Sequence, residues 1–590
     1  MPYDSAVLSA VVKELKDQLS GAKINKIHQP NMHTLVLKYH SHQGNGKLLL
    51  SSHPKNGRLH LSEASYTNPD KAPMFAMVMR KWLDGAKITD INCTDCERVA
   101  SICFENYNEI GDIVHLKLII EIMGKHSNII LVNSDGIIID GIRRYGSSLS
   151  RWREVLPGRI YKDPPPINKL HLPPSNVEEL ANALYATSDA NVSQSLQRNI
   201  SGLSPMLAEQ ISLSAGISSD RSCDTLGLSD MENIFTALCS WRKDLDSGSF
   251  SPTLRCENSR YTDFAAIAPM AWPQKQHESC HSMNEAVDKF YQAKEHEQNM
   301  SAHKQQLLKL LRTHINRLQK KIAIQESDLA RCETAQEHKE SGDLLAAYIW
   351  QLEKGMESIE LPSFENPDQM IKIKLDPALS PQENVQRCYR KYAKAKHSYD
   401  LIYQQLEANR AELDYVLSIE QPIMDSESFA ELEELEKEMI ASGYLRPVFS
   451  GKSRKSSNKP AGKSTPLPPR RYISSVGFVV LIGRNNRQND RLSLKQAAEH
   501  DIWLHTQKIA GSHVIIVTEG KQVPEQTINE AASWAAWFSH AKDSSQVPVD
   551  ILQAGRLKKP PGSKPGYVIY TGQKTKYVVP CNPIKYEIEK

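Results

Sequence analysis

The sequence predicts a multidomain α+β fold made of four folded parts and one linker. At 590 residues the chain is too long for one ordinary hydrophobic core, so we expect roughly three or four domains. Short β-rich runs dominate the first part, two heptad-patterned segments the middle, and a mixed pattern the end. The expected parts are a mixed α/β domain at 1–172, a helical module at 173–270, a long antiparallel coiled-coil arm with a small tip at 271–449, a basic linker at 450–471 and an α/β domain at 472–590.

The N-terminal domain begins with a helical pattern and continues in strand-like runs. Apolar residues recur at helical intervals over 5–19 and stop before Gly21, a residue type that often ends helices. A second helix is expected after Pro73, with its apolar residues on one face. The strand-like runs are 34–39, 47–51, 58–61, 99–104, 113–122, 128–132 and 137–140.

The helical module follows two proline breaks, at 164–166 and 173–174. Its pattern is helical from about 175 to 240, with a turn at 200–205 that contains Gly202. Small helices flanking a Gly-centred turn suit a helix-hairpin-helix-like module, whose helix N-terminus offers backbone N–H groups to phosphate. A plain helical connector is the alternative.

The arm is predicted from two long heptad seams. Apolar residues alternate at spacings of three and four over 308–329 and again over 385–416, with charged residues alongside. The segment between them contains Gly and Pro residues that cannot continue a long helix, so the two helices should fold back with a small globular tip. Polar Gln325 and Asn409 fall on the seams, where they either fix the register or are tolerated defects.

The last two segments differ sharply in composition. Residues 450–471 contain seven Lys or Arg and no acidic residue, which predicts a flexible cationic linker. Such a charge run either contacts RNA phosphates or is a solvated spacer. In the final domain we expect strands at 477–482 and 513–517 and a helix near 528–542, whose alanines suit close packing.

The composition is that of a folded protein with balanced charge. Apolar residues make up 40% and charged residues 24%, and the net charge is only +3, so any nucleic-acid affinity must come from local basic patches. No run approaches the ~20 apolar residues that cross a bilayer, and the first residues lack a signal-peptide pattern, so we expect a cytoplasmic protein without membrane contact.

Ten dispersed cysteines fit reduced thiols. Cys93-x-x-Cys96 has no second pair at zinc spacing, so we expect no metal and no cofactor.

Several motifs, taken together and in order, resemble the NFACT family along essentially the whole chain. The most telling is the segment Glu-Ile-Met-Gly-Lys-His-Ser-Asn at 121–128, and the C-terminal set includes Asp-Ile-Trp-Leu-His at 501–505. The motifs that carry the resemblance lie at 21–30, 48–54, 73–75, 79–83, 108–112, 121–128, 156–158, 375–377, 380–384, 483–490, 501–505, 511–514 and 558–567.

The resemblance implies a role in ribosome-associated quality control. Such proteins bind a large (50S) ribosomal subunit that still carries peptidyl-tRNA. Bacterial members recruit alanyl-tRNA (tRNA-Ala) and direct mRNA-independent addition of alanine to the stalled chain, with a small RNA-binding partner, RqcP, and the tail marks the product for degradation. We therefore expect a ribosome-associated, non-catalytic factor that supplies binding and geometry while the ribosome performs peptidyl transfer.

The resemblance also assigns candidate tRNA-binding residues in the N-terminal domain. Family members use an N-terminal Asp, matched by Asp4, and an Asp-Arg pair, whose place Glu97 and Arg98 occupy here. A guanidinium can stack on a base or hold a phosphate through two hydrogen bonds, whereas Glu97 adds a methylene relative to Asp. Lys125 and His126 could face RNA, or they could belong to a tight structural turn.

In the C-terminal domain, which the resemblance makes an RNA-binding domain, cations between turn-forming residues are candidates for rRNA contacts. Trp503 is expected in the core rather than stacked on a base, and His505 and His513 are expected to be hydrogen-bonded structural residues, because no third metal ligand is evident. The candidate rRNA-binding residues are Arg484, Arg487, Lys558, Lys559 and Lys564.

Two other functions were weighed. The N-terminal domain and helical module resemble the Fpg-type DNA glycosylases, which predicts an Fpg-like fold, and Pro2 could supply their secondary-amine nucleophile. However, Tyr3 stands where those enzymes place a catalytic Glu and no zinc-finger cysteine set follows, so kinship of fold without the activity is preferred. The second is a surface adhesin that binds fibronectin, an older label of the family, for which the sequence offers no signal peptide, lipidation motif or anchor.

Overall fold

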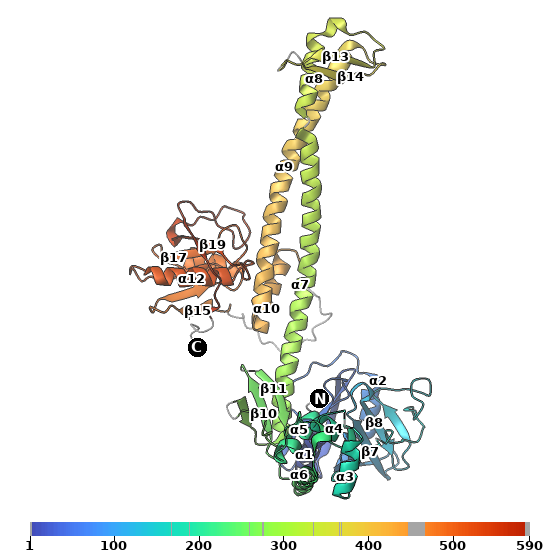
Figure 1. Cartoon of the computed structure of the whole chain (residues 1–590). Coiled ribbons are helices and arrows are strands. Elements are labelled where there is room, and N and C mark those ends of the chain that lie inside the picture. The colour runs from blue at the N-terminus through green and yellow to red at the C-terminus, as the bar shows by residue number, and fades with distance from the viewer. Residues whose placement is uncertain are drawn as a thin grey trace. The chain divides into compact units, whose positions relative to one another are not determined.

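The computed structural model describes residues 3–166, 168–187, 189–258, 260–273, 276–333, 335–364, 366, 369–446 and 466–583 (Figure 1). It divides the chain into two compact units, Met1–Gln298 and Asn299–Lys590. This division differs from the expected start of the arm at residue 271. The reason is that the first turns of the long helix α7 (Met283–Glu333) bury Met283, Val287 and Phe290 in the core of the first unit.

The larger sheet of the first unit has nine strands among the described residues, and its neighbouring strands pair antiparallel. All seven strand-like runs of the sequence are strands of this sheet. Two further strands, β1 and β5, were not expected, because their polar residues obscure the alternation. In spatial order the strands are β4 (Arg58–Leu61), β3 (Gly44–Ser51), β2 (Thr34–Ser41), β1 (Lys23–Asn31), β5 (Lys87–Cys93), β6 (Val99–Tyr107), β7 (Ile113–Glu121), β8 (Asn128–Asn133) and β9 (Ile138–Gly141).

Both expected helices of this domain are present, α1 (Ser5–Leu19) and α2 (Met74–Leu83). The apolar face of α1 is fully buried against the sheet, and Leu8 and Leu15 are among its buried residues. The same core continues into the helical module, so the module is part of the first unit. The Fpg-like character of the domain stays a prediction.

The helical module contains α3 (Val177–Tyr185), α4 (Val192–Asn199), α5 (Pro205–Ser214), the 3-10 turn η2 (Cys223–Thr225) and α6 (Leu228–Ser247). The Gly202 turn lies between α4 and α5, as the sequence predicts. The helices cover the predicted range of about 175 to 240, and the rest of the module contains two strands that form a small sheet with a third strand beyond it. Its order is β11 (Arg260–Ala265), β10 (Thr253–Glu257), β12 (His277–Ser279).

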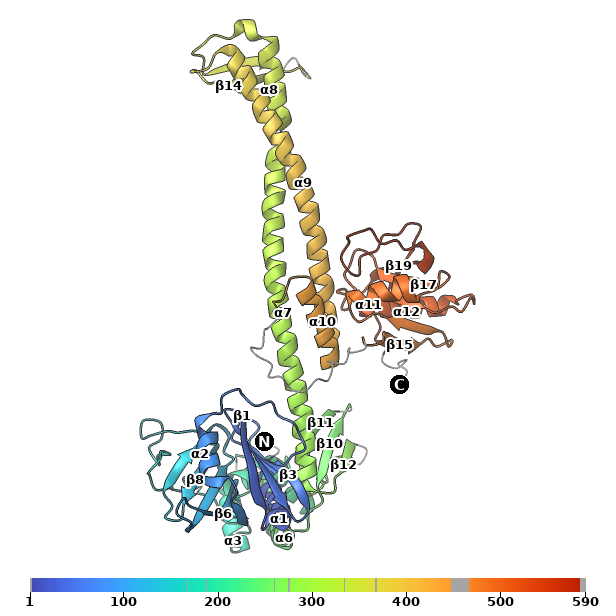
Figure 2. The same cartoon turned by 180° about the vertical axis from the view of Figure 1, so that it is seen from behind.

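In the second unit, α7 from residue 299 runs antiparallel to α9 (Pro381–Asp425), and Figures 1 and 2 show the two helices side by side. Asn409 donates a hydrogen bond to Gln325 over 2.7 Å, and both are buried, which favours the register-fixing interpretation. The expected tip contains α8 (Ala335–Ala347), η4 (Ile349–Gln351) and a hairpin of β13 (Ser358–Pro362) and β14 (Met370–Lys374). The supercoil of a coiled coil stays a prediction.

The end of the chain forms a six-stranded sheet among the described residues, and its neighbouring strands pair antiparallel. It is therefore an α+β domain rather than a parallel α/β domain. Helix α12 (Glu525–Trp537) buries the expected alanine face. The strands in spatial order are β15 (Arg470–Ile473), β16 (Val479–Ile482), β18 (Val514–Ile516), β17 (Ile502–Thr506), β19 (Val547–Gln553) and β20 (Lys574–Val578).

The remaining short elements are α10 (Phe429–Ala441), α11 (Asn486–Arg491), the π turn η5 (Leu492–Gln496) and the 3-10 turns η1 (Gly124–His126) and η6 (Ala554–Arg556). Of the predicted basic linker, residues 450–465 lie outside the described part. Arg470 and Arg471 belong to β15, so the folded domain begins inside the range assigned to the linker.

Candidate nucleic-acid interfaces

Asp4 is a buried capping residue in the first unit. Its Oδ1 accepts a hydrogen bond from the backbone N–H of Val7 over 3.0 Å and caps α1, and its Oδ2 accepts one from the Ser204 hydroxyl over 2.8 Å. Burial raises the pKa of the Asp4 carboxyl, while these hydrogen bonds and Arg98 act in the opposite direction. With 6% of its surface exposed and both oxygens engaged, Asp4 is placed to position its neighbours.

The turn between α4 and α5 packs against the segment that precedes Glu97. Ser5 donates a hydrogen bond to the Gly202 carbonyl over 2.8 Å. Gly202 has a φ of +78°, and a Cβ there would lie 2.9 Å from the Cβ of Cys96, which itself has a φ of +55°. Only glycine fits this close approach without strain. The fold thus brings the Gly-centred turn, Asp4 and the Glu97-Arg98 segment together, although 105 residues separate Glu97 from Gly202 in the sequence.

Glu97 and Arg98 directly precede β6, and both are half-buried rather than exposed. Burial lowers the pKa of the Arg98 guanidinium and the Asp4 carboxylate opposes this, so Arg98 lies within electrostatic range of Asp4. The pKa of Glu97 is raised by burial first and then by Asp163. Each of the two side chains therefore has an acidic neighbour. Asp4 is favourable for the positive charge of Arg98, whereas Asp163 is unfavourable for a negative charge on Glu97.

Lys125 and His126 lie in the 3-10 turn η1, and both side chains are exposed. The backbone of this turn is held by Arg143, whose Nη1 donates to the Lys125 carbonyl over 2.6 Å, and by Ser127, whose hydroxyl accepts from the Met123 N–H over 2.9 Å. Both interpretations of the sequence are therefore compatible with the structure, because the backbone is structural and the side chains remain accessible.

A buried ion pair beside this turn was not anticipated. Glu121, at the end of β7, is fully buried and accepts hydrogen bonds from both terminal nitrogens of Arg153, over 2.6 and 2.5 Å, and from the Tyr161 hydroxyl over 2.8 Å. This arrangement holds the segment around 153–161 against β7 and supports η1. The signal in the sequence was an acidic residue that directly follows the apolar run 118–120 at the end of this strand.

The five candidate cations of the C-terminal domain fall into two groups. Arg487, Lys558 and Lys564 are exposed, whereas Arg484 and Lys559 are half-buried. Arg484 donates to the Pro468 carbonyl over 3.0 Å and forms an ion pair with Glu431 of α10. Lys559 forms an ion pair with Asp490, and the Lys564 ammonium lies over the ring of Tyr415, 5.2 Å from its centroid. Arg484, Lys559 and Lys564 therefore each have an intramolecular partner, and their role as rRNA contacts stays a prediction.

The contacts of Arg484 belong to a polar patch at the base of the arm. Glu431 is 5% exposed and also lies 3.5 Å from Arg470, and the neighbouring Glu434 accepts from the Asn485 amide over 2.9 Å. The Asn486 amide donates to the Ser418 hydroxyl over 2.7 Å. The sequence gives no direct signal for these pairings, because their partners lie 39 to 68 residues apart.

Trp503 lies in the core, as expected, and His505 and His513 pack against it. Trp503 is fully buried, with its ring stacked on His505 and edge-on to His513. His513 Nδ1 shares a hydrogen bond with the Ser493 hydroxyl over 2.7 Å, and burial lowers the pKa of both histidines. Within the described ranges, no group of three or more His, Cys, Asp or Glu side chains is arranged to hold a metal ion.

The residues of the glycosylase hypothesis are differently placed. Pro2 lies outside the described residues. The Tyr3 hydroxyl donates to the Leu59 carbonyl over 2.5 Å and is fully buried, so Tyr3 serves the core. Cys93 and Cys96 are free thiols, and burial raises the pKa of Cys96 to about 11, which disfavours a reactive thiolate.

Comparisons with known proteins define the class to which this architecture belongs. A family model described as NFACT N-terminal and middle domains matches residues 4–459, and one described as NFACT protein RNA binding domain matches residues 469–573. The first match contains the candidate tRNA-binding residues of the sheet domain. The second match contains the candidate rRNA-binding residues of the last domain. The chain belongs to the NFACT family.

Individual relatives extend the match to almost the full length. The chain is 33% identical over 582 residues to the protein named Rqc2 homolog RqcH of Bacillus subtilis (strain 168), with 98% of both chains covered. It is equally identical, over the same length and coverage, to the Rqc2 homolog RqcH of Streptococcus suis (strain 05ZYH33). The solved N-terminal part of the fibronectin/fibrinogen-binding protein from Streptococcus suis is 32% identical and covers 49% of this chain and 99% of its own, with a TM-score of 0.40.

Across the described residues, no helix combines the length and the apolar character that crossing a membrane requires.

Proposed function

We propose that this chain is a ribosome-associated quality-control factor. It binds stalled large (50S) subunits that carry peptidyl-tRNA, recruits alanyl-tRNA and directs mRNA-independent addition of alanine to the C-terminus of the nascent chain. The ribosome performs peptidyl transfer, and this protein supplies binding and geometry, the entropic component of the rate enhancement. Its partners are tRNA-Ala, rRNA and RqcP, and it acts in the cytoplasm. The observation that carries the proposal is the alignment with proteins named Rqc2 homolog RqcH, which covers 98% of this chain and 98% of theirs.

In the first unit, Arg98 is the proposed tRNA contact. Its guanidinium is half-buried, so a base or phosphate that meets it would be partly shielded from water, which strengthens a charge-assisted hydrogen bond. Asp4 acts through its neighbours, because its oxygens are already engaged by Val7 and Ser204. Glu97, and the exposed Lys125 and His126, are the further residues proposed to face the tRNA.

In the last domain, Arg487 and Lys558 are the proposed first contacts to rRNA phosphates, because both side chains are exposed. Arg484, Lys559 and Lys564 remain in the proposed rRNA-binding set, but each must exchange an intramolecular partner for a phosphate. Neutralising phosphates releases counterions, so this binding should weaken steeply as salt rises.

Sedimentation of cell lysates tests the proposal. The chain should travel with large subunits at low salt and be released at high salt, since phosphate contacts are screened. A protein that stays with washed cell envelopes and never with ribosomes would contradict the proposal and favour the adhesin alternative. A covalent adduct with abasic DNA after borohydride reduction would instead favour a glycosylase-type lyase.

A further inference from the structure

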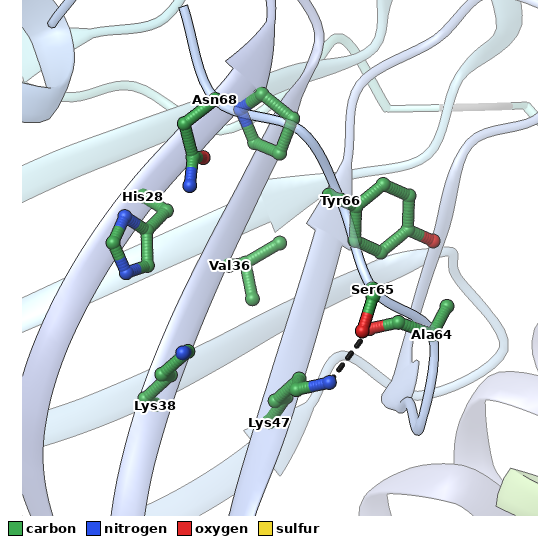
Figure 3. Close-up of a pocket in the computed structure, with 9 residues that line it drawn as sticks. His28, Val36, Lys38, Lys47, Ala64, Ser65, Tyr66 and Asn68 are labelled. Atoms are coloured by element: carbon green, nitrogen blue, oxygen red, sulfur yellow. Dashed lines mark hydrogen bonds between the residues drawn. The ribbon is translucent and has the colours of Figure 1, made fainter. Parts of the chain in front are cut away.

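A pocket lies on the outer face of strands β1, β2 and β3, under the segment 62–72 that joins β4 to α2 (Figure 3). It encloses about 370 Å³, counting space that is open to solvent. Figure 3 shows Val36 in the centre, between His28 on the strands and Tyr66 on the crossing segment, with Lys38 and Lys47 below it and Asn68 above. Side chains alternate along a strand, so Val36 and Lys38 point away from the core that Leu35 and Leu37 help to form.

Three lysines stand in one row across these strands. Lys26 of β1 pairs with Lys38 of β2, and Lys38 pairs in turn with Lys47 of β3. Like charges directly opposite each other destabilise a sheet. All three lysines belong to the described residues, and Lys26 and Lys38 are exposed. An anion bound beside the row would stabilise it.

The wall of the pocket is already ordered. Lys47 donates hydrogen bonds to the carbonyls of Glu63 and Ala64, over 3.1 and 2.8 Å, which ties the crossing segment to β3. The start of the segment is also fixed to α7, because the Ser62 hydroxyl and the Glu63 N–H both donate to the Asp288 carboxylate, over 2.7 and 3.0 Å. A site whose wall is fixed in advance loses less entropy when a ligand binds.

The second tie to α7 comes from inside the pocket. The hydroxyl of Tyr66, which lines the pocket, donates to Glu295 over 3.3 Å. The Tyr66 ring and the Val36 side chain supply apolar surface, Asn68 offers an amide, and Lys38 offers an exposed ammonium group. A nucleotide offers a matching group for each of these. The ammonium group can bind its phosphate, the amide can hydrogen-bond to the edge of its base, and the apolar surface can pack against the face of its base or sugar.

We propose that this pocket binds the phosphate of a nucleotide, with Lys38 and Lys26 facing the phosphate and Val36 and Tyr66 against the attached sugar or base. The nucleotide is a residue of the RNA that the first unit engages, and in this respect the inference rests on the proposed function. His28 contributes as a neutral hydrogen-bonding group near pH 7, because burial, Lys38, Arg80 and Lys26 lower its pKa.

Lysine labelling of the full chain tests the site directly. Acetylation is quantified at each lysine by mass spectrometry, alone, with a single-stranded RNA oligonucleotide and with adenosine monophosphate. Lys117, an exposed lysine of β7 outside the pocket, is the control. Protection of Lys38 by RNA alone supports an RNA residue as the ligand. Protection by adenosine monophosphate as well supports the phosphate site and shows that it accepts free nucleotides. Protection of Lys38 by neither, or of Lys117 equally, overturns the proposal.

A pair of variants supplies a second readout. Lys38→Gln should weaken RNA binding severalfold and lower the salt slope by about 0.7, the value for one phosphate of a single strand, whereas Lys117→Gln should change neither. An unchanged slope in Lys38→Gln contradicts the site. Ribosome co-sedimentation is measured on the wild type in parallel. If the wild type sediments with large subunits while Lys38 stays unprotected, only the pocket proposal fails. If it does not sediment, the proposed function fails, whatever adenosine monophosphate does to Lys38.

Discussion

The hydroxyl of Ser204 donates a hydrogen bond to the carboxylate of Asp4 over 2.8 Å, although 200 positions separate the two residues in the sequence. The same Ser204 oxygen accepts the Leu207 N–H over 3.2 Å and caps α5, while Asp4 caps α1 through Val7. The N-termini of two helices from different parts of the first unit therefore share one polar contact beside Arg98. This contact fixes the surroundings of Arg98, the proposed tRNA-binding residue.

Replacing Ser204 with Ala should destabilise the first unit. The variant loses a helix cap and leaves one oxygen of a buried carboxylate without its donor, and each loss costs about 1–2 kcal/mol. Thermal unfolding of the full chain, followed by a probe in the first unit, measures the effect. Ser218→Ala, at an exposed serine of the same unit, is the control. Equal stability of the two variants would show that the Asp4 contact contributes little.

Replacing Arg98 with Ala should reduce tRNA recruitment and leave subunit binding largely intact. A hydrogen bond to a charged group contributes about 1.5–3 kcal/mol, so the affinity for tRNA should fall roughly 10- to 150-fold. Arg98→Lys should rescue it only partly, because an ammonium cannot reproduce the planar, two-pronged contact. The measurement is the amount of tRNA per purified subunit complex. A parallel loss of tRNA and of subunit binding would show that Arg98 is structural.

Charge reversal should have different effects on stability at Lys558 and at Lys559. Lys558 is exposed, so Lys558→Glu should lower rRNA affinity and reduce the salt slope by about one unit. Lys559 is paired with Asp490, so Lys559→Glu places two acids together and should also lower the melting temperature of the domain. Fluorescence anisotropy across a salt series and thermal unfolding report the two effects. The same melting temperature for both variants would contradict the intramolecular role of Lys559.

The buried His60 should make the first unit sensitive to acid. Its Nε2 accepts from Arg58 over 3.1 Å, its Nδ1 shares a hydrogen bond with the Leu61 carbonyl over 2.7 Å, and burial together with Arg58 lowers its pKa to about 3. The unfolded chain takes up a proton as the pH falls through about 6.5, and the folded state does not. The folding free energy should therefore weaken by about 1.4 kcal/mol per pH unit below 6.5.

His60→Gln should flatten this dependence, because an amide can accept from Arg58 and donate to Leu61 without titrating. Denaturant unfolding between pH 7 and pH 4 measures the slope. His115→Gln, at an exposed histidine of β7, is the control and should keep the wild-type slope. A wild-type slope in His60→Gln would mean that other groups cause the acid sensitivity.

The sequence predicted those elements whose periodicity is strong. Helix α1 was expected over 5–19 and is found at Ser5–Leu19, and the long helices and the tip of the arm were expected in the correct order. Strand β1 was missed because the segment Lys23–Asn31 has several polar residues and a proline, and its alternation appears only once the neighbouring strands are known. The small sheet of β10, β11 and β12 was missed for the same reason, since its strands are short and polar.

The candidate sites were predicted less completely than the fold. The resemblance named Arg98 and Lys558 as candidates, and their roles stay predictions. The sequence could not show that Arg484 is paired with Glu431, because that contact forms between the last domain and α10. Nor could it show that Ser204 reaches Asp4, since neither residue belongs to a motif with the other. The row of Lys26, Lys38 and Lys47 became visible only through strand register.

Sequencing the tRNAs that co-purify with this protein on large subunits tests the central claim most directly. The account predicts strong enrichment of tRNA-Ala over the cellular pool with the wild type, and loss of this enrichment with Arg98→Ala while the amount of bound subunit stays similar. A tRNA population identical to the cellular pool, or an absence of tRNA on subunits that do carry the protein, would contradict it.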